Sequence, residues 1–327
     1  APERRWRWRT LLLLVALVAA AGFTLYRETA SRVDEATAEV TADVVSSYNL
    51  LQGAVAADDA ELFVTTLSGR DPQWTSTQEA LFDEGLLLDR QSLGLHALPA
   101  PVLDADTLGN TAVTIDFNPE LTSAVLTVPR PYTLTTQSGD VDTVLLAQTA
   151  VYRKGSRNWL YAPPERDFWG EWQAINGQRL ILSAPARDME LARRLFDDIE
   201  AAITEACTTP YDLGCDADLA VQVRLGSDPE LLFSLRNNRP LLDAPGQLEL
   251  PTPTLLGLPT DADSYDAIRA IYTRAVLKHT ITRVIEWPCC QRTSIYQALL
   301  DAQLAEMGYG RWPVTAHDYL RMLLVGY

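Results

Sequence analysis

The residues with the clearest chemical potential lie in the segment 275–285, where His279 is followed by Thr280 and, four positions after His279, by Arg283. Residues four apart share one face of a helix, so two histidines at this spacing can bind one metal ion while a carboxylate between them activates water. Arg283 stays cationic and would repel a metal, and a threonine hydroxyl is not a base near neutral pH. We therefore expect His279 to pair with a neighbouring carboxylate or to pack in the core, and we assign no catalytic or metal-binding residue and no cofactor.

The elements expected around this segment point to a family. The second half of the chain is expected to run strand, helix, strand, loop, long helix and shorter helix. This order resembles the small catalytic domain of the gluzincin, or peptidase-MA-like, zinc peptidases, whose H-E-x-x-H motif lies on the long helix. The resemblance implies that His279 stands at the first ligand position, with Thr280 in place of the general base and Arg283 in place of the second histidine. Asp301 or Glu306 would correspond to the third ligand. The resemblance thus implies a pseudoenzyme.

Signatures of other enzyme classes are absent from the sequence. It contains no G-x-S-x-G turn, no Walker phosphate loop and no G-x-G-x-x-G loop. Three histidines in the whole chain exclude a histidine-rich metal centre. The pair His317 and Asp318 is expected to cap a helix, and His96 lies in a loop without an evident role. A net charge of −16 excludes binding of nucleic acid through its phosphates.

Four cysteines, Cys207, Cys215, Cys289 and Cys290, are the candidates for disulfides. An even number outside the cytoplasm favours disulfides, and adjacent cysteines rarely pair with each other. Either Cys207 pairs with Cys215 alone, or both pair with the cysteines at 289 and 290. A zinc site on these cysteines is disfavoured, because no C-x-x-C spacing occurs.

The N-terminal segment has the pattern of a membrane anchor. An uncharged run from Thr10 to Tyr26 is long enough to cross the hydrocarbon core of a bilayer. Arginines before the run keep that end in the cytoplasm, and tryptophans favour the headgroup layer. The flanking residues are Arg4, Arg5, Trp6, Arg7, Trp8, Arg9 and, after the run, Arg27. We expect a single-pass anchor at residues 1–27 with the bulk of the chain outside the cytoplasm. The alternative is a signal peptide cleaved after the alanines at 19–21, which would secrete the chain.

The periodicity predicts an α+β fold in two domains. A polar stalk at 28–41 is followed by helical spacing, with Asp58 as the cap of a second helix and a capping box of Ser76 and Glu79 opening a third. Alternating strands follow near 113–117, 123–129, 142–153 and 157–162. Helices first and antiparallel strands second resemble the cone-shaped domain of the nuclear-transport-factor and polyketide-cyclase superfamily. The expected domains are a cone-like one at 42–168 and a degenerate peptidase-like one at 169–327.

Four large aromatic residues lie where the two expected domains meet: Trp159, Phe168, Trp169 and Trp172. They could form a platform for a ligand, but we expect them to pack between the domains.

The sequence therefore predicts a noncatalytic protein that binds or senses outside the membrane, or an accessory subunit of a membrane assembly with a protein partner. One alternative is an exported zinc-peptidase-like hydrolase with atypical ligands around His279, which predicts bound metal. Another is small-molecule binding or cyclase-like activity in the cone, which predicts a pocket lined by apolar strand residues.

Overall fold

The computed structural model describes residues 23, 27–28, 32, 35–90, 93–100, 102–104, 108, 112–135, 140–208, 213–233, 247–284 and 294–310. No helix among these residues is long and apolar enough to cross a membrane. Arg27 is among them, whereas the other residues assigned to the anchor and its flank, apart from Phe23, lie outside the described residues, as do Cys289, Cys290 and His317.

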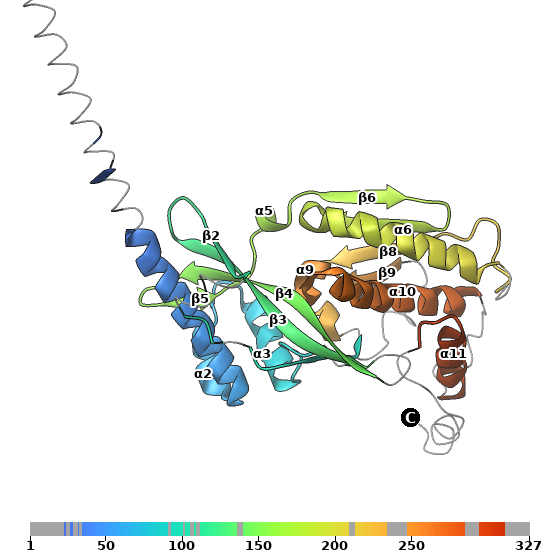
Figure 1. The fold of residues 1–327 in the computed structure, drawn as a ribbon, viewed down its shortest axis with the longest axis horizontal. Coiled ribbons are helices and arrows are strands. Elements are labelled where there is room, and N and C mark those ends of the chain that lie inside the picture. Colours follow the sequence, from blue (N-terminus) through green and yellow to red (C-terminus); the bar gives the residue numbers. More distant parts are fainter. Residues whose placement is uncertain are drawn as a thin grey trace, which may run out of the picture.

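The first half packs three helices against an antiparallel sheet (Figure 1). The helices span residues 35–56, α2 (Ala60–Thr66) and α3 (Pro72–Asp83). The long strands β3 (Ser123–Thr135) and β4 (Val141–Lys154) pair along their whole length. The short strands β1 (Leu95–Ala97) and β2 (Thr114–Phe117) pair with β3, and β5 (Trp159–Tyr161) pairs with β4. The predicted α+β class is confirmed at this level.

Two aspartates begin the short helices. Asp59 accepts a hydrogen bond from Leu62 N at 3.0 Å, and Asp71 accepts one from Trp74 N at 3.1 Å. The predicted helix starts were wrong on this point, because the cap of α2 is Asp59 and not Asp58, and Ser76 lies inside α3. A proline at the first helical position after Asp71 favours the earlier start, since its missing N–H would be unpaired there in any case.

The second half builds a separate four-stranded sheet in the order β6-β7-β8-β9. After the short helix α5 (Arg166–Trp169), β6 (Trp172–Asn176) pairs antiparallel with β7 (Leu180–Pro185). The strands β7, β8 (Val221–Gly226) and β9 (Gln247–Pro251) are parallel to one another. The sheet is therefore mixed, with one antiparallel and two parallel pairings.

Helices cover this second sheet. The long helix α6 (Met189–Ala206) connects β7 to β8, and α10 (Ala262–Val284) lies beside it (Figure 1). A short helix α9 (Pro253–Leu256) precedes α10, and α11 (Ser294–Glu306) packs on α10. Cys207 caps the end of α6 and forms a disulfide with Cys215, which is one of the two predicted pairings.

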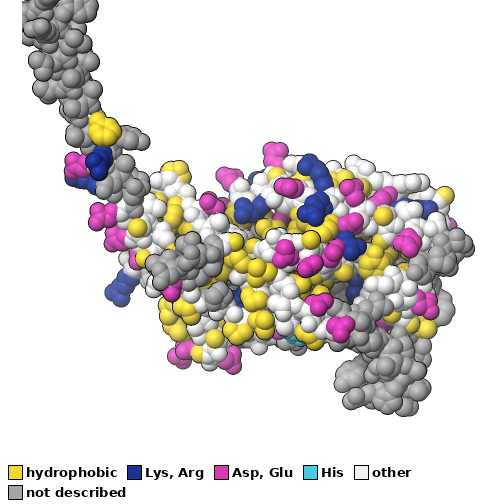
Figure 2. Space-filling view, viewed as in Figure 1, with side chains coloured by type: hydrophobic (Ala, Val, Ile, Leu, Met, Phe, Trp, Pro, Cys, Tyr) yellow, Lys and Arg dark blue, Asp and Glu magenta, His cyan; other side chains and the backbone are white. Residues whose placement is uncertain are grey.

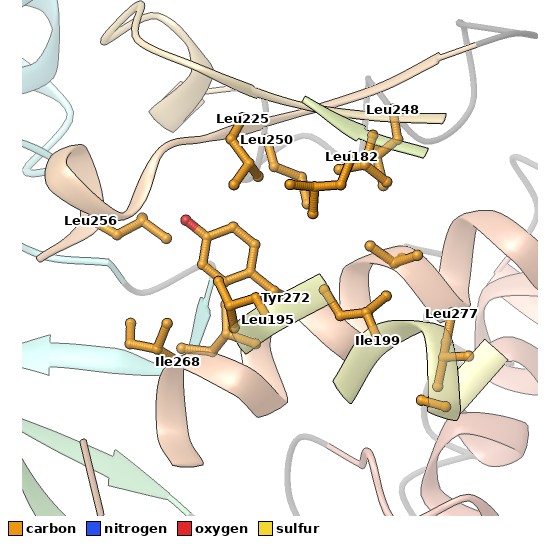
Figure 3. Packing of buried hydrophobic residues seen from close by; sticks show 14 of the residues in the cluster. Leu182, Leu195, Ile199, Leu225, Leu248, Leu250, Leu256, Ile268, Tyr272 and Leu277 are labelled. Carbon is orange, nitrogen blue, oxygen red and sulfur yellow. The ribbon is translucent and has the colours of Figure 1, made fainter. Parts of the chain in front are cut away.

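The main core lies between these helices and the second sheet. Tyr272 of α10 is surrounded by leucine and isoleucine side chains from α6 and from β7 to β9 (Figure 3). Its hydroxyl donates a hydrogen bond to Pro251 O at 2.6 Å, so the one polar atom of this large side chain has a partner.

The same core continues into the first half, so the two halves are joined by packing. Leu81, Tyr132 and Leu146 belong to the cluster that contains Tyr272. The expected domain boundary between 168 and 169 falls inside α5. The short strand β10 (Leu258–Pro259), from the second half, pairs with β4 of the first. Gly257, at a φ of 124°, allows this approach, because a Cβ there would lie 2.4 Å from Gln148 Nε2.

Candidate functional site

A cavity of about 410 Å³ lies where the helices of the first half, the face of its sheet and two loops of the second half meet. The helix at 35–56 and α3 supply one wall, and β3, β4 and β5 supply another. The second half closes it with the loop 227–229, which follows β8, and with Thr254 and Leu255 of α9. Residues of both halves therefore line the cavity.

Alternation along the paired strands selects which residues of the sheet reach the cavity. Ala124, Leu126, Val128, Arg130 and Tyr132 alternate along β3, and each is buried. Their partners on β4 are Tyr152, Ala150, Gln148, Leu146 and Val144, in that order. Residues opposite each other on paired strands point to the same face. A single arginine thus interrupts an otherwise apolar and aromatic row on β3.

Arg130 is 3% exposed and lines the cavity without a carboxylate partner among the described residues. Its guanidinium donates to Gln52 Oε1, on the first helix, and to Leu98 O at 3.4 Å. Both acceptors are neutral oxygens. The Tyr48 hydroxyl is a further hydrogen-bond partner of Arg130, and this contact and the charge of Arg130 oppose the rise that burial causes in the pKa of Tyr48. The positive charge is thus placed in a low-dielectric site without a described anion to balance it.

Arg90, also on the cavity wall, is bound differently. Its Nη1 donates to three carbonyl oxygens of its own turn, those of Leu86, Leu87 and Asp89, at 2.6–3.2 Å. Its Nη2 donates to Leu255 O at 3.2 Å, across the junction of the halves. Burial lowers the pKa of Arg90, and the nearby tyrosines and Asp89 oppose that effect. Arg90 therefore ties a turn of the first half to α9.

Tyrosines supply the other polar groups of the cavity. Burial raises the pKa of Tyr48 and of Tyr152, and it raises the pKa of Tyr161 to about 12. All three therefore stay protonated near neutral pH and can donate a hydrogen bond. Tyr152 is 1% exposed, and its hydroxyl has no hydrogen-bond partner among the described residues. A buried unpartnered hydroxyl is costly, so an acceptor brought to this atom would stabilise the structure.

An aromatic wall completes the cavity. The rings of Trp74 and Tyr161 meet edge to face with centroids 5.0 Å apart, and Phe168 and Trp169 do so at 4.9 Å. These last two are half-buried, with the Arg187 guanidinium over the Phe168 ring.

The four aromatic residues of the link do not form one interface. Trp159 is buried in the first half against Phe117, and Trp172 is 40% exposed with Arg224 over its ring. Only Phe168 and Trp169 line the cavity.

The carboxylates that line the cavity lie at its rim. Asp71 and Asp228 are exposed, and each accepts a hydrogen bond from a nearby backbone N–H, that of Trp74 or Glu230. Carboxylates are also spread over the face of the molecule shown in Figure 2. An acidic exterior therefore surrounds a cavity whose deep charges are cationic.

Asp188 sets the position of the part of the second half that closes the cavity. This buried carboxylate accepts hydrogen bonds from the hydroxyls of Thr252 and Thr254 and from Thr254 N, the last at 3.1 Å. Burial raises the pKa of Asp188, and the threonine hydrogen bonds oppose that rise. The start of α9 is thereby fixed to the start of α6.

His279 lies away from this cavity, on the buried face of α10. It is 1% exposed, and neither ring nitrogen has a hydrogen-bond partner in the part of the chain that the structure describes. Burial, assisted by Arg283, lowers the pKa of His279 to about 4. The neutral ring is therefore packed in the core, which is one of the two predicted settings. Among the described residues no carboxylate pairs with it.

The other positions of the peptidase comparison are engaged elsewhere. The Thr280 hydroxyl donates to Val276 O, and Arg283 donates to Ala220 O at 3.0 Å. Asp301 pairs with Arg274 at 2.7 Å. Within the described part of the chain, no group of three or more His, Cys, Asp or Glu side chains could hold a metal ion. His96 is exposed, with Nδ1 3.7 Å from Asp89 Oδ2.

Sequence reasoning missed Arg130 and Tyr152. The signal was present, because an arginine at an inward position of an alternating apolar strand must be buried if the alternation continues. The strand was expected to end near 129, one residue too early to include Arg130.

Comparison of the chain with protein-family models, curated proteins and solved structures finds no match.

Proposed function

We propose that the chain is a noncatalytic binding protein, anchored to the membrane by its N-terminal segment and with its bulk outside the cytoplasm, that holds a small organic molecule in the cavity. The observation that carries this proposal is the cavity itself. Its volume of about 410 Å³ lies within the range of roughly 300–1,000 Å³ of small-molecule sites. Its wall combines apolar and aromatic side chains with a few buried polar groups, as such sites do.

The chemistry of the lining favours binding over catalysis. General acid–base catalysis needs a group whose pKa lies near the working pH. The tyrosines of the cavity titrate far above neutral pH, and its arginines are cations. Asp71 and Asp228 are exposed and already accept hydrogen bonds that order their own loops. These groups can orient a ligand but are poorly suited to move its protons.

The location of the cavity supports a sensing role. Tyr48, Leu51 and Gln52 come from the helix that follows the N-terminal segment, and the loop 227–229 comes from the second half. A ligand in the cavity would contact both. Its binding free energy would therefore stabilise the contact between the two halves, and a partner protein could respond to that change.

The two family resemblances belong to this proposal. Helices that pack on one face of an antiparallel sheet around a cavity support the comparison of 42–168 with the cone-shaped domains. The order strand, helix, strand and long helix supports a degenerate peptidase-like second half, in which His279 is a core residue. The disulfide between Cys207 and Cys215 suits an oxidising location outside the cytoplasm. Phe23, from the apolar N-terminal run, is 65% exposed, which suits contact with lipid.

The test uses three aromatic probes of one shape, 1-naphthoate, 1-naphthamide and 1-naphthylmethylammonium, with the full chain in detergent. At least one should bind saturably with one molecule per chain in calorimetric titration. Ala150→Phe places a ring in the cavity and should abolish that binding. Because the probes also partition into micelles, the difference between the two proteins is the readout.

Ala174→Phe is the matched control, since Ala174 is exposed on β6 and does not line the cavity. Equal binding to all three proteins would show that the probes do not use the cavity, and absence of saturable binding to the unmodified chain would refute the proposed function.

A further inference from the structure

We infer that the ligand of the cavity is a small organic monoanion with an apolar or aromatic body, whose carboxylate is held by Arg130 with Tyr152 as a second donor. This inference rests on the proposed function and adds the chemical class of the ligand. It follows from the difference between the two buried arginines of the cavity and from the composition of its walls.

Arg130 has the unused hydrogen-bonding capacity that such a ligand needs. A guanidinium carries five N–H donors in a planar fork. The partners that the structure shows for Arg130 are Gln52 Oε1, the Tyr48 hydroxyl and Leu98 O, the last at the long distance of 3.4 Å. Four carbonyl contacts, by contrast, engage Arg90. Nε of Arg90 also lacks a partner among the described residues, but its four carbonyl contacts hold that guanidinium in place. Arg130 has more N–H groups left with which to donate two parallel hydrogen bonds to a carboxylate.

The charge of the site selects the sign of the ligand. Arg130 is 3% exposed and Arg90 is 5% exposed, and each is without a carboxylate salt bridge among the described residues. The two guanidiniums are close enough that Arg130 contributes to lowering the pKa of Arg90. A cationic ligand would add a third positive charge to a site of low dielectric constant. An anion would balance the existing charge, which makes it the favoured occupant.

A second, independent observation lies on the neighbouring strand. Tyr152 is on β4, on the same face as Gln148 and Ala150, and its buried hydroxyl has no partner. A carboxylate oxygen would accept the hydrogen bond that this hydroxyl cannot make in the empty protein. Ala150 between the two polar residues leaves space beside the sheet for the ligand.

The other lining residues determine what kind of ligand body the cavity can hold. Trp74, Tyr161, Phe168 and Trp169 offer ring faces and edges, and Leu51, Leu81 and Leu126 offer aliphatic surface. A planar or apolar body suits these walls. Inorganic phosphate is disfavoured, because it would leave the apolar surface of the cavity uncovered.

The experiment compares the charged forms of one probe shape on the full chain. We expect 1-naphthoate to bind at least about tenfold more tightly than 1-naphthamide, since hydrogen bonds between charged partners are about twice as strong as neutral ones. The ammonium probe should bind most weakly. Inorganic phosphate should displace 1-naphthoate no better than chloride does.

Arg130→Gln should bring the affinity for 1-naphthoate down to that for 1-naphthamide. The matched control is Arg153→Gln. Arg153 is next to Tyr152 on β4, so its side chain lies on the opposite face of the same sheet. It pairs with Glu165 and does not line the cavity, so the tenfold preference should remain.

The outcomes separate the two proposals. If 1-naphthamide binds the unmodified chain as tightly as 1-naphthoate, and Ala150→Phe abolishes that binding, the site exists but the anionic class is wrong. Displacement by phosphate at concentrations where chloride has no effect would also overturn the carboxylate assignment. If none of the probes binds, both proposals fail. The order of the probe affinities on the unmodified chain tests the anionic class of the ligand even if Arg130→Gln does not fold.

Discussion

The cavity and the helix α10 both bury polar side chains, but they do so in different ways. On α10, Thr280 and Thr282 donate to carbonyls one turn back, and the neutral ring of His279 is enclosed by the core. In the cavity, the buried groups Arg130 and Tyr152 border an open volume of about 410 Å³. Burial by itself therefore does not mark a functional site. The difference is whether the polar atoms border space that a ligand can enter.

The difference is sharpest between the two arginines. Arg90→Gln would leave carbonyls of its own turn and of Leu255 without their donor, which should cost about 3–5 kcal/mol in the free energy of unfolding. Arg130→Gln should cost less than about 1 kcal/mol, because it removes a poorly compensated buried charge together with its few hydrogen bonds. Chemical denaturation of both variants checks this. Equal large losses would mean that Arg130 is structural and unavailable to a ligand.

For α10, the comparison is tested by the pH dependence of the free energy of unfolding. The pKa of His279 is about 4 in the folded chain and 6.5 in the unfolded chain. Between these values the unfolded state binds more protons, so stability should fall as the pH drops from 6.5 to 4. Each pKa unit corresponds to about 1.4 kcal/mol, so the full loss should be of the order of 3 kcal/mol. Unfolding measured across this range provides the value.

His279→Leu should remove that part of the pH dependence, and at neutral pH it should leave stability unchanged or higher, since the ring nitrogens have no partners to lose. The raised pKa of Asp188 acts in the opposite direction, because it favours the folded state at low pH. The difference between parent and variant therefore isolates His279. Stoichiometric zinc in the purified parent, absent from His279→Leu, would contradict a sealed neutral histidine and revive the peptidase alternative.

The smallest effect concerns the rim of the cavity. Asp71 caps α3, so Asp71→Ala should cost about 1 kcal/mol. Ser76→Ala, inside the same helix, should change stability by less than about 0.5 kcal/mol in either direction, because Ser76 is not the cap. Thermal unfolding of the two variants measures this. A larger loss from Ser76 than from Asp71 would contradict the observed start of the helix.

Much of the fold could be predicted because local patterns are strong there. The alternation in β3 and β4 and the helical spacing from Leu191 to Ala202 correspond to elements that the structure contains. The short strands β1, β6, β9 and β10 were missed, because two to five residues carry too little periodicity to distinguish them from loops. The site was missed because its residues come from segments that lie far apart in the sequence.

The sequence by itself determined the acidic charge, the α+β class, the apolar N-terminal run and the lack of a second histidine four residues after His279. These properties depend on composition and on neighbours within a few residues. Only the tertiary structure decided that Cys207 pairs with Cys215, that His279 is enclosed, and that Arg130 borders a cavity closed by both halves. Whether a buried polar group has a partner depends on side chains brought together by folding, such as Gln52 and Leu98 around Arg130. That information is not local to any segment of the chain.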